Sequence, residues 1–140
     1  MKPRSFKLSR YPETLAVVRI GPGTEVPKWA ESSSLFSITA TATETSIVCA
    51  ARSVPTKSVH QRPFTAFEVE GPLDFALTGV LAELLAPLAA AEISVFTLST
   101  FDTDWILVPG DKADEAAEVW RRSGHEVTAA VPAKPPRKKR

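Results

Sequence analysis

GPLDFALTGVLAELLAPLAAAEISVFTLSTFDTDWILV, residues 71–108, is the stretch that decides the fold. It opens with a Gly-Pro pair, and residues 73–92 then form an apolar run rich in Leu and Ala that favours a helix. Two runs rich in β-branched and aromatic residues follow at 93–100 and 104–109, with a polar link between them. The stretch therefore predicts a helix followed by a β-hairpin.

The flanking residues complete a six-element unit. Residues 64–72 form a strand before the stretch, residues 111–124 form a second helix after it, and residues 125–131 form a last strand. The apolar stripe of the second helix consists of Ala113, Ala116, Ala117 and Trp120. The order β-α-β-β-α-β is that of the ferredoxin-like fold, so we expect an α+β protein in which two helices cover one face of a four-stranded antiparallel sheet.

The first half has a shorter version of this order. A strand at 14–20 ends in the Gly-Pro-Gly turn 21–23, and Pro27 begins a helical segment with room for no more than two turns. Two further strands are expected at 35–42 and 45–51. The first half therefore lacks a full first helix.

Two pairs of segments suggest an internal repeat. AVVRIGP at 16–22 matches AFEVEGP at 66–72, and TATETSIVC at 41–49 matches TFDTDWILV at 100–108. A duplicated unit explains both matches, because one small sheet buries little surface alone; chance similarity between strands is the alternative. The predicted organisation is an N-terminal arm at 1–13, an abbreviated unit at 14–60, a complete unit at 61–132 and a disordered basic tail at 133–140.

Two segments outside these units have no strand or helix pattern. Residues 1–12 are basic, and we expect an arm that lies on the surface or packs through Phe6, Leu8 and Tyr11. Residues 53–63, SVPTKSVHQRP, have the composition of a loop that separates two lobes.

The bulk composition indicates a compact protein. The chain has 140 residues, of which 44% are hydrophobic, enough for one domain or for two small lobes that share a core. Cys49 is the single cysteine, and no secretory leader is apparent. The apolar stretch 80–91 contains Glu83 and falls short of the roughly 20 residues that cross a bilayer. We therefore expect a cytoplasmic protein without a membrane partner.

The charge is distributed unevenly. Five of the 17 basic residues lie within 134–140, which leaves 12 basic against 16 acidic residues in the first 133, a formal charge of −4. A mildly acidic body makes nucleic acid an unlikely partner. The basic tail is expected to be a solvated end; nonspecific attraction to a polyanion is the alternative.

Residues suited to catalysis are few. His60 and His125 have no nearby partners in the sequence, and Cys49 lies in an apolar strand as a small hydrophobe would. These three residues have no metal-ligand spacing, and the GPG at 21–23 lacks the third glycine and the helix of a nucleotide-binding loop. The sequence therefore predicts no enzymatic activity, no metal and no cofactor.

The start of the first long helix is a candidate binding site. Asp74, Thr78 and Gly79 lie where backbone N–H groups are unpaired and favour a carboxylate. Gly79 lets a ligand or another backbone approach closely, or it serves helix packing alone. Asp74 is equally well explained as a helix N-cap.

Residues 71–108, together with TATETSIVC, resemble the ACT-domain family, and specifically the compact tandem-ACT proteins related to the cytosolic arginine sensors. The motifs LTG at 77–79 and STFDTD at 99–104 carry this resemblance. It implies a non-catalytic regulatory module that binds a small effector, usually an amino acid, at an interface between ACT units. The resemblance further implies a homodimer. The alternative is a dimerising module that binds no ligand and regulates a partner protein by contact.

The resemblance also implies which residues form the site. Asp104 would face a cationic group of the ligand, and the amides of the helix start would face its carboxylate. The first half reads TATETS and has no acid that matches Asp104, so one site is expected and arginine specificity is not carried over. The implied ligand-binding residues are Asp74, Phe75, Leu77, Thr78, Gly79, Ser99, Thr100, Phe101, Asp102 and Asp104.

Overall fold

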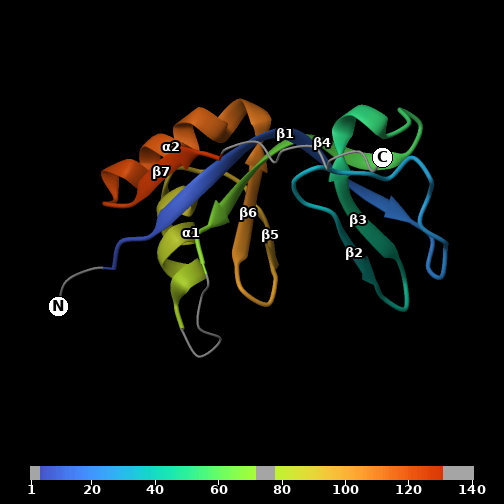
Figure 1. The fold of residues 1–140 in the computed structure, drawn as a ribbon, viewed down its shortest axis with the longest axis horizontal. Helices are drawn as coiled ribbons and strands as arrows, with labels where there is room; N and C mark the ends of the chain where they lie inside the picture. Colours follow the sequence, from blue (N-terminus) through green and yellow to red (C-terminus); the bar gives the residue numbers. More distant parts are fainter. Residues whose placement is uncertain (1–3, 72–77, 131–140) are drawn as a thin grey trace, which may run out of the picture.

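A single curled sheet forms the centre of the molecule (Figure 1). The computed structural model describes residues 4–71 and 78–130, and all structural statements concern these residues. Its strands are β1 (Lys7–Ile20), β2 (Ser37–Ala40), β3 (Thr45–Ala50), β4 (Val59–Val69), β5 (Phe96–Ser99), β6 (Asp104–Pro109) and β7 (Glu126–Ala129). Its helices are α1 (Val80–Ala90) and α2 (Ala113–Arg122), with short 3₁₀ turns η1 (Ala51–Ser53) and η2 (Gly110–Lys112).

The sheet is built around the antiparallel pair β1 and β4. The strand order is β2-β3-β1-β4-β6-β5, with β7 added beside β1, so each half supplies a long central strand, an inner strand and an edge strand. In Figure 1 β1 and β4 run across the molecule and join the part that carries the helices to the part formed by β2 and β3. The two halves thus share one continuous sheet.

Both helices pack on the same face of the sheet, which confirms the predicted α+β fold. The stripe predicted for α2 is buried, with Trp120 fully enclosed. The Trp120 ring meets the Phe67 ring edge-on at 4.9 Å between centroids. Its Nε1–H donates to the Leu84 carbonyl on α1 at 2.8 Å, so one side chain links sheet, α1 and α2. Buried hydrophobic side chains of this size are worth about 1.5–3 kcal/mol each and supply most of the driving force for the fold.

The position of β1 differs from the four-stranded sheet that was expected. The first residues of β1 lie between β4 and β7, antiparallel to β4 and parallel to β7. Leu8 is fully buried in the helix-side core, opposite Val69 on β4 and Val127 on β7. The strand therefore begins inside the predicted N-terminal arm, which packs on the core through Leu8 as one of the two expectations had it.

The predicted loop at 53–63 is wrong in its second part. β4 begins at Val59, and residues 59–61 pair with β1, with Val59 opposite Arg19 and Gln61 opposite Val17. Pro63 lies where the register shifts between Leu15 and Val17 of β1. Proline is tolerated at such an irregularity because no ladder hydrogen bond is required there, so it did not end the strand.

The short helix expected from Pro27 is a single turn, closed by a hydrogen bond of 3.1 Å from the Ala30 N–H to the Pro27 carbonyl. Among the described residues the first half has no α-helix. Trp29 and Ala30 instead pack on a small core around Val18, Ile47 and Cys49. The first half is therefore abbreviated, as its sequence indicates.

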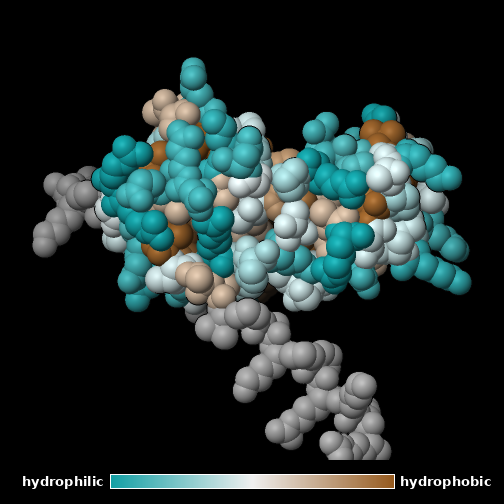
Figure 2. Space-filling model, turned by 90° about the horizontal axis from the view of Figure 1, so that it is seen from above, coloured by the Kyte–Doolittle hydropathy of each residue, from teal (hydrophilic) through white to brown (hydrophobic). Residues whose placement is uncertain are grey.

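The sheet face opposite the helices has an apolar cluster of its own. It contains buried Leu15 and Leu107, and the Tyr11 and Trp105 rings lie 5.0 Å apart between centroids. This cluster joins residues of both halves and is only partly covered. By contrast, the face seen in Figure 2 is mainly hydrophilic, with hydrophobic residues in separate spots.

Candidate functional site

The predicted site comes from two segments. Thr78 and Gly79 lie at the start of α1, and Ser99–Asp104 form the hairpin between β5 and β6. Asp74, Phe75 and Leu77 lie outside the described residues.

The hairpin link is a structural turn. The Thr100 N–H donates to the Thr103 carbonyl at 2.8 Å, and the Thr103 N–H donates to Thr100 Oγ1 at 3.1 Å. The hairpin of the first half has the same arrangement, with the Thr41 N–H donating to the Glu44 carbonyl at 2.8 Å. The polar residues at both positions are therefore explained by turn formation, as ST-type turns require. Phe101 and Asp102 at the tip are exposed.

Asp104 stands at the base of the hairpin, beside the turn. It is half-buried, lies opposite Ser99 on β5, and accepts a hydrogen bond of 2.6 Å from the Ser99 hydroxyl at Oδ1. On its other side it pairs in register with Val69, near the end of β4. A hydroxyl on one oxygen holds the carboxylate in place and leaves its second oxygen available.

The start of α1 and the hairpin lie at the same end of the sheet (Figure 1). The register between Val69 and Asp104 accounts for this, because the chain that leaves β4 leads toward α1. The structure thus brings the two segments to one end of the molecule. Thr78 and Gly79 belong to the helix-start segment, and Ser99 and Asp104 belong to the hairpin segment.

Gly79 begins α1 in the left-handed region, with φ of 77°. No side chain caps the helix start among the described residues, so its first N–H groups keep their partial positive charge. A side chain at position 79 would be strained by this backbone conformation. The glycine is therefore required by the turn into the helix, whether or not a ligand approaches it.

Arg4 is a residue at this helix start that the sequence did not indicate. Its Nη2 donates to the Thr78 carbonyl at 2.9 Å, and its Nε donates to Glu83 Oε1 at 2.7 Å. The same Nη2 lies 3.3 Å from the position that a Cβ on Gly79 would occupy. Arg4 thus forms an ion pair with Glu83 in the first turn of α1. A single arginine in a basic segment without pattern gives no signal of this contact.

The two histidines and the cysteine considered for catalysis are buried or hydrogen-bonded to the backbone. His125 is buried, and its Nδ1 accepts a hydrogen bond of 3.1 Å from the Phe6 N–H. Burial lowers the pKa of His125, which favours the neutral ring that this bond requires. Cys49 is fully buried, and burial raises the pKa of its thiol, which makes it a poor nucleophile. His60 lies in β4, where its Nδ1 is 2.6 Å from the Ser58 carbonyl.

Neither metal coordination nor membrane insertion has support in the described part of the chain. No group of three or more His, Cys, Asp or Glu side chains there could hold a metal ion. No helix in residues 4–71 and 78–130 has the length and apolarity to span a bilayer.

Residues 59–122 match the family model of the ACT domain. This match, over slightly less than half of the chain, is to the family that the sequence resembles, which confirms the resemblance. A second model, described as an N-terminal domain, matches residues 13–57.

Part of the chain is similar to curated relatives. A protein named cytosolic arginine sensor for mTORC1 subunit 1 is 45% identical over 51 residues in Homo sapiens and 39% identical over 51 residues in Mus musculus. The aligned part is 36% of this chain and 16% of the human protein, or 15% of the mouse protein. The chain thus covers a small part of these relatives.

Solved structures share the fold. A protein from Agrobacterium tumefaciens has a TM-score of 0.85 at 27% identity, with 94% of this chain and 99% of that chain covered. The regulatory subunit of aspartate kinase from Thermus flavus has a TM-score of 0.61 at 7% identity, with 84% and 96% covered. At 7% identity the second match concerns the fold alone.

Proposed function

We propose that this protein is a non-catalytic regulatory protein that binds a small effector, an amino acid, between the start of α1 and the β5–β6 hairpin. The observation that carries the proposal is the position of Asp104. This carboxylate stands at the base of the hairpin, at the same end of the sheet as an uncapped helix start. An amino acid carries the two charges that such a site would recognise.

Each side of the site has a role. Asp104 receives a cationic group of the ligand on the oxygen that Ser99 does not occupy. The N–H groups at the start of α1 receive the carboxylate.

The wider setting is part of the same proposal. The match of residues 59–122 to the ACT domain supports a regulatory role, and the curated relatives are named as cytosolic arginine sensors. We propose by analogy a cytoplasmic protein that forms a homodimer, with a site completed at the interface between units. A partner protein would bind the ligand-bound form of this protein and the ligand-free form with different affinities.

A module that acts by contact alone is the second candidate. Phe101 at the hairpin tip is 79% exposed, and an exposed aromatic side chain is a common anchor in protein interfaces. Such a module would need no ligand between α1 and the hairpin.

A thermal-shift screen separates the two candidates. The full chain is heated with each proteinogenic amino acid in turn, and at least one is expected to raise the midpoint, since ligand at 100 times its Kd stabilises by about 2.7 kcal/mol. Midpoints that do not move with any amino acid would refute the sensor proposal. Asp104→Asn should abolish the shift, whereas Glu25→Gln, which removes an exposed acid that has no side-chain hydrogen bond or ion pair with the described residues, should preserve it.

A further inference from the structure

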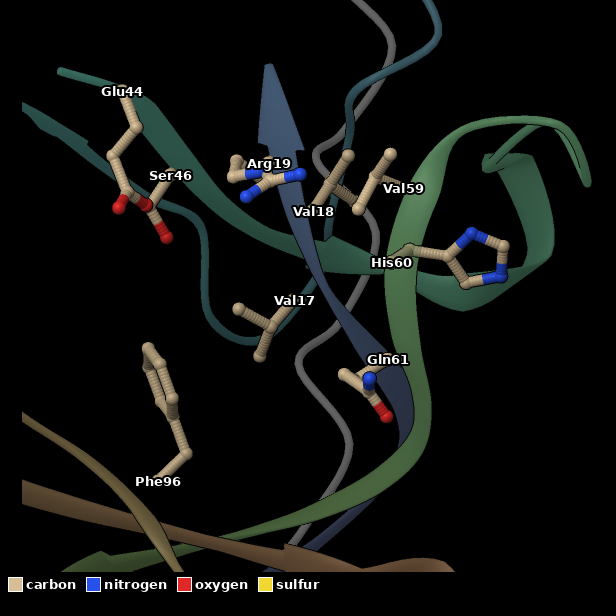
Figure 3. A pocket seen from close by; sticks show the side chains of 9 residues that line it. All are labelled: Val17, Val18, Arg19, Glu44, Ser46, Val59, His60, Gln61 and Phe96. Carbon is tan, nitrogen blue, oxygen red and sulfur yellow. The ribbon is translucent and has the colours of Figure 1, made fainter. Parts of the chain in front are cut away.

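A hollow lies on the sheet face opposite the helices. Figure 3 shows the side chains that line it. Its volume is about 310 Å³. It lies over β1, β3 and β4, and Phe96 of β5 reaches it from the other half of the molecule. The residues used below are Val17, Arg19, Glu44, Ser46, Gln61 and Phe96.

The sheet register places these side chains on one face. Arg19 lies opposite Ser46 on β3, and Val17 lies opposite Gln61 on β4. Because side chains two residues apart share a face, Val17 and Arg19 point the same way. In Figure 3 the Glu44 and Ser46 side chains lie on one side of the hollow and the Phe96 ring lies on the other, with Val17 between them.

The charges at this hollow have no partners in the described part of the chain. Neither the Arg19 guanidinium nor the Glu44 carboxylate has a hydrogen bond or an ion pair with residues 4–71 or 78–130. By contrast, Arg52 of the first half is paired with Glu13 at 2.8 Å. Two opposite charges that do not neutralise each other at the edge of an apolar hollow suit a ligand that carries both signs.

We propose that this hollow is a binding site for a neutral amino acid with an apolar side chain. The α-carboxylate meets Arg19, the α-ammonium meets Glu44, and the side chain lies against Val17 and the Phe96 ring. The volume of about 310 Å³ is at the small end of ligand pockets, which gives room for one amino acid. The site shares no residue with the one proposed above, so either can be wrong alone.

The test uses the full chain and three probes that differ in charge. L-Phenylalanine carries both charges, L-phenylalaninol lacks the carboxylate, and 3-phenylpropanoic acid lacks the ammonium. L-Phenylalanine is expected to bind with millimolar or better affinity, and each of the other probes is expected to bind roughly tenfold or more weakly. In ¹⁵N spectra the shifts should occur at Val17, Ser46 and Gln61, and not at Gly79 or Asp104.

Two variants assign the charges. Arg19→Gln should lower the affinity for L-phenylalanine roughly tenfold and leave the affinity for L-phenylalaninol unchanged. Glu44→Gln should lower the affinity for L-phenylalanine roughly tenfold and leave the affinity for 3-phenylpropanoic acid unchanged. Arg122→Gln is the matched control, because Arg122 is exposed on α2, and it should bind as the wild type does. Folding of the variants is checked by their circular dichroism.

Three results would overturn the proposal. The first is that L-phenylalanine does not bind to the wild type. The second is that Arg19→Gln and Glu44→Gln bind L-phenylalanine with the affinity of the wild type. The third is that the chemical-shift changes are confined to Gly79 and Asp104. A change of sedimentation in the two variants without a change in binding would assign these charges to contacts between copies of the chain instead.

Discussion

Ser99 and Asp104 face each other across the β5–β6 hairpin, and the Ser99 hydroxyl donates a hydrogen bond of 2.6 Å to the Asp104 carboxylate. This bond holds Asp104, an acid at the position where the first hairpin has Thr45. A carboxylate held in one orientation loses less entropy when a cation binds. The relationship therefore links the turn, which is structural in both halves, to the binding role proposed for one of them.

Removing the Ser99 hydroxyl tests this link. Ser99→Ala should weaken amino-acid binding by a smaller factor than Asp104→Asn does, because the acid remains but loses its orientation. The free energy of unfolding should fall by less than about 1 kcal/mol, since the bond is exposed. Ser94→Ala, which removes another exposed hydroxyl, is the control. Affinities measured by calorimetry would oppose the link if Ser99→Ala and Ser94→Ala were indistinguishable.

Truncating Leu8 tests whether the N-terminal residues belong to the core. Leu8 is fully buried between β4 and β7, so Leu8→Ala should lower the free energy of unfolding by about 2–5 kcal/mol. Lys7→Ala, at the exposed neighbouring position, should change it by less than about 0.5 kcal/mol. Urea unfolding measures both, and a loss for Leu8→Ala as small as that for Lys7→Ala would mean that this segment is a surface arm.

The same segment shows where sequence reasoning stops. The second half was predicted well because its patterns are local: the α2 stripe repeats with helical spacing, and β6 is a continuous apolar run. The packing of the first segment through Leu8 was one of the two expectations, but the strand that begins at Lys7 was missed because residues 7–13 have no strand period. The burial of Leu8 depends on β7, which follows more than a hundred residues later.

The candidate site was predictable to a similar degree. Gly79 was chosen because a helix start is visible in the chain, and Asp104 because the resemblance to the ACT-domain family implies it; their roles in binding stay predictions. Arg4 was not chosen, since its contact with Thr78 joins residues far apart in sequence. The pairing of residues 59–61 with β1 was missed because Pro63 is normally a strand breaker, and its tolerance depends on a bulge that only the paired strands reveal.

Glu13 is held by a cradle of hydrogen-bond donors. Its carboxylate accepts bonds from the hydroxyls of Ser32 and Ser34, each at 2.6 Å, from the Ser33 hydroxyl at 2.8 Å, and from Arg52 Nη1 at 2.8 Å. Its side chain is 7% exposed. Glu13→Gln replaces an acceptor oxygen by an amide donor, so we expect a loss of about 2 kcal/mol in the free energy of unfolding.

Glu25→Gln is the matched control for that variant, because Glu25 is exposed and its loss should be within about 0.5 kcal/mol. Both are measured by urea unfolding at neutral pH. Equal stability of the two variants would mean that the cradle around Glu13 contributes nothing.

The pH dependence of stability gives a separate test of Glu13. Burial alone would raise the pKa of Glu13, but the hydroxyls, Arg52 and the backbone N–H of Ser33 outweigh it and hold the pKa well below its usual range. A lowered folded pKa contributes stability that is present above the ordinary glutamate pKa of 4.5 and is lost as pH falls below it. The wild type should therefore lose more stability than Glu13→Gln between about pH 6 and about pH 3. Parallel pH curves for the two proteins would contradict this cause.

Trp120 connects both helices to the sheet. Trp120→Phe removes the Nε1–H that donates to the Leu84 carbonyl and leaves a cavity, so a loss of about 2–4 kcal/mol is expected. Trp29→Phe, at a half-buried position in the first half, should cost less. Thermal unfolding of the two variants compares them directly, and a larger loss for Trp29→Phe would place the main core in the first half.

The most direct test of the proposed function is a calorimetric titration of the wild type and Asp104→Asn with the amino acid that gives the largest thermal shift. The account predicts that Asp104→Asn, folded as judged by circular dichroism, binds that amino acid at least about tenfold more weakly, because one charge-assisted hydrogen bond is lost. Equal affinity in the two proteins would contradict the assignment of the effector site to Asp104 and the start of α1.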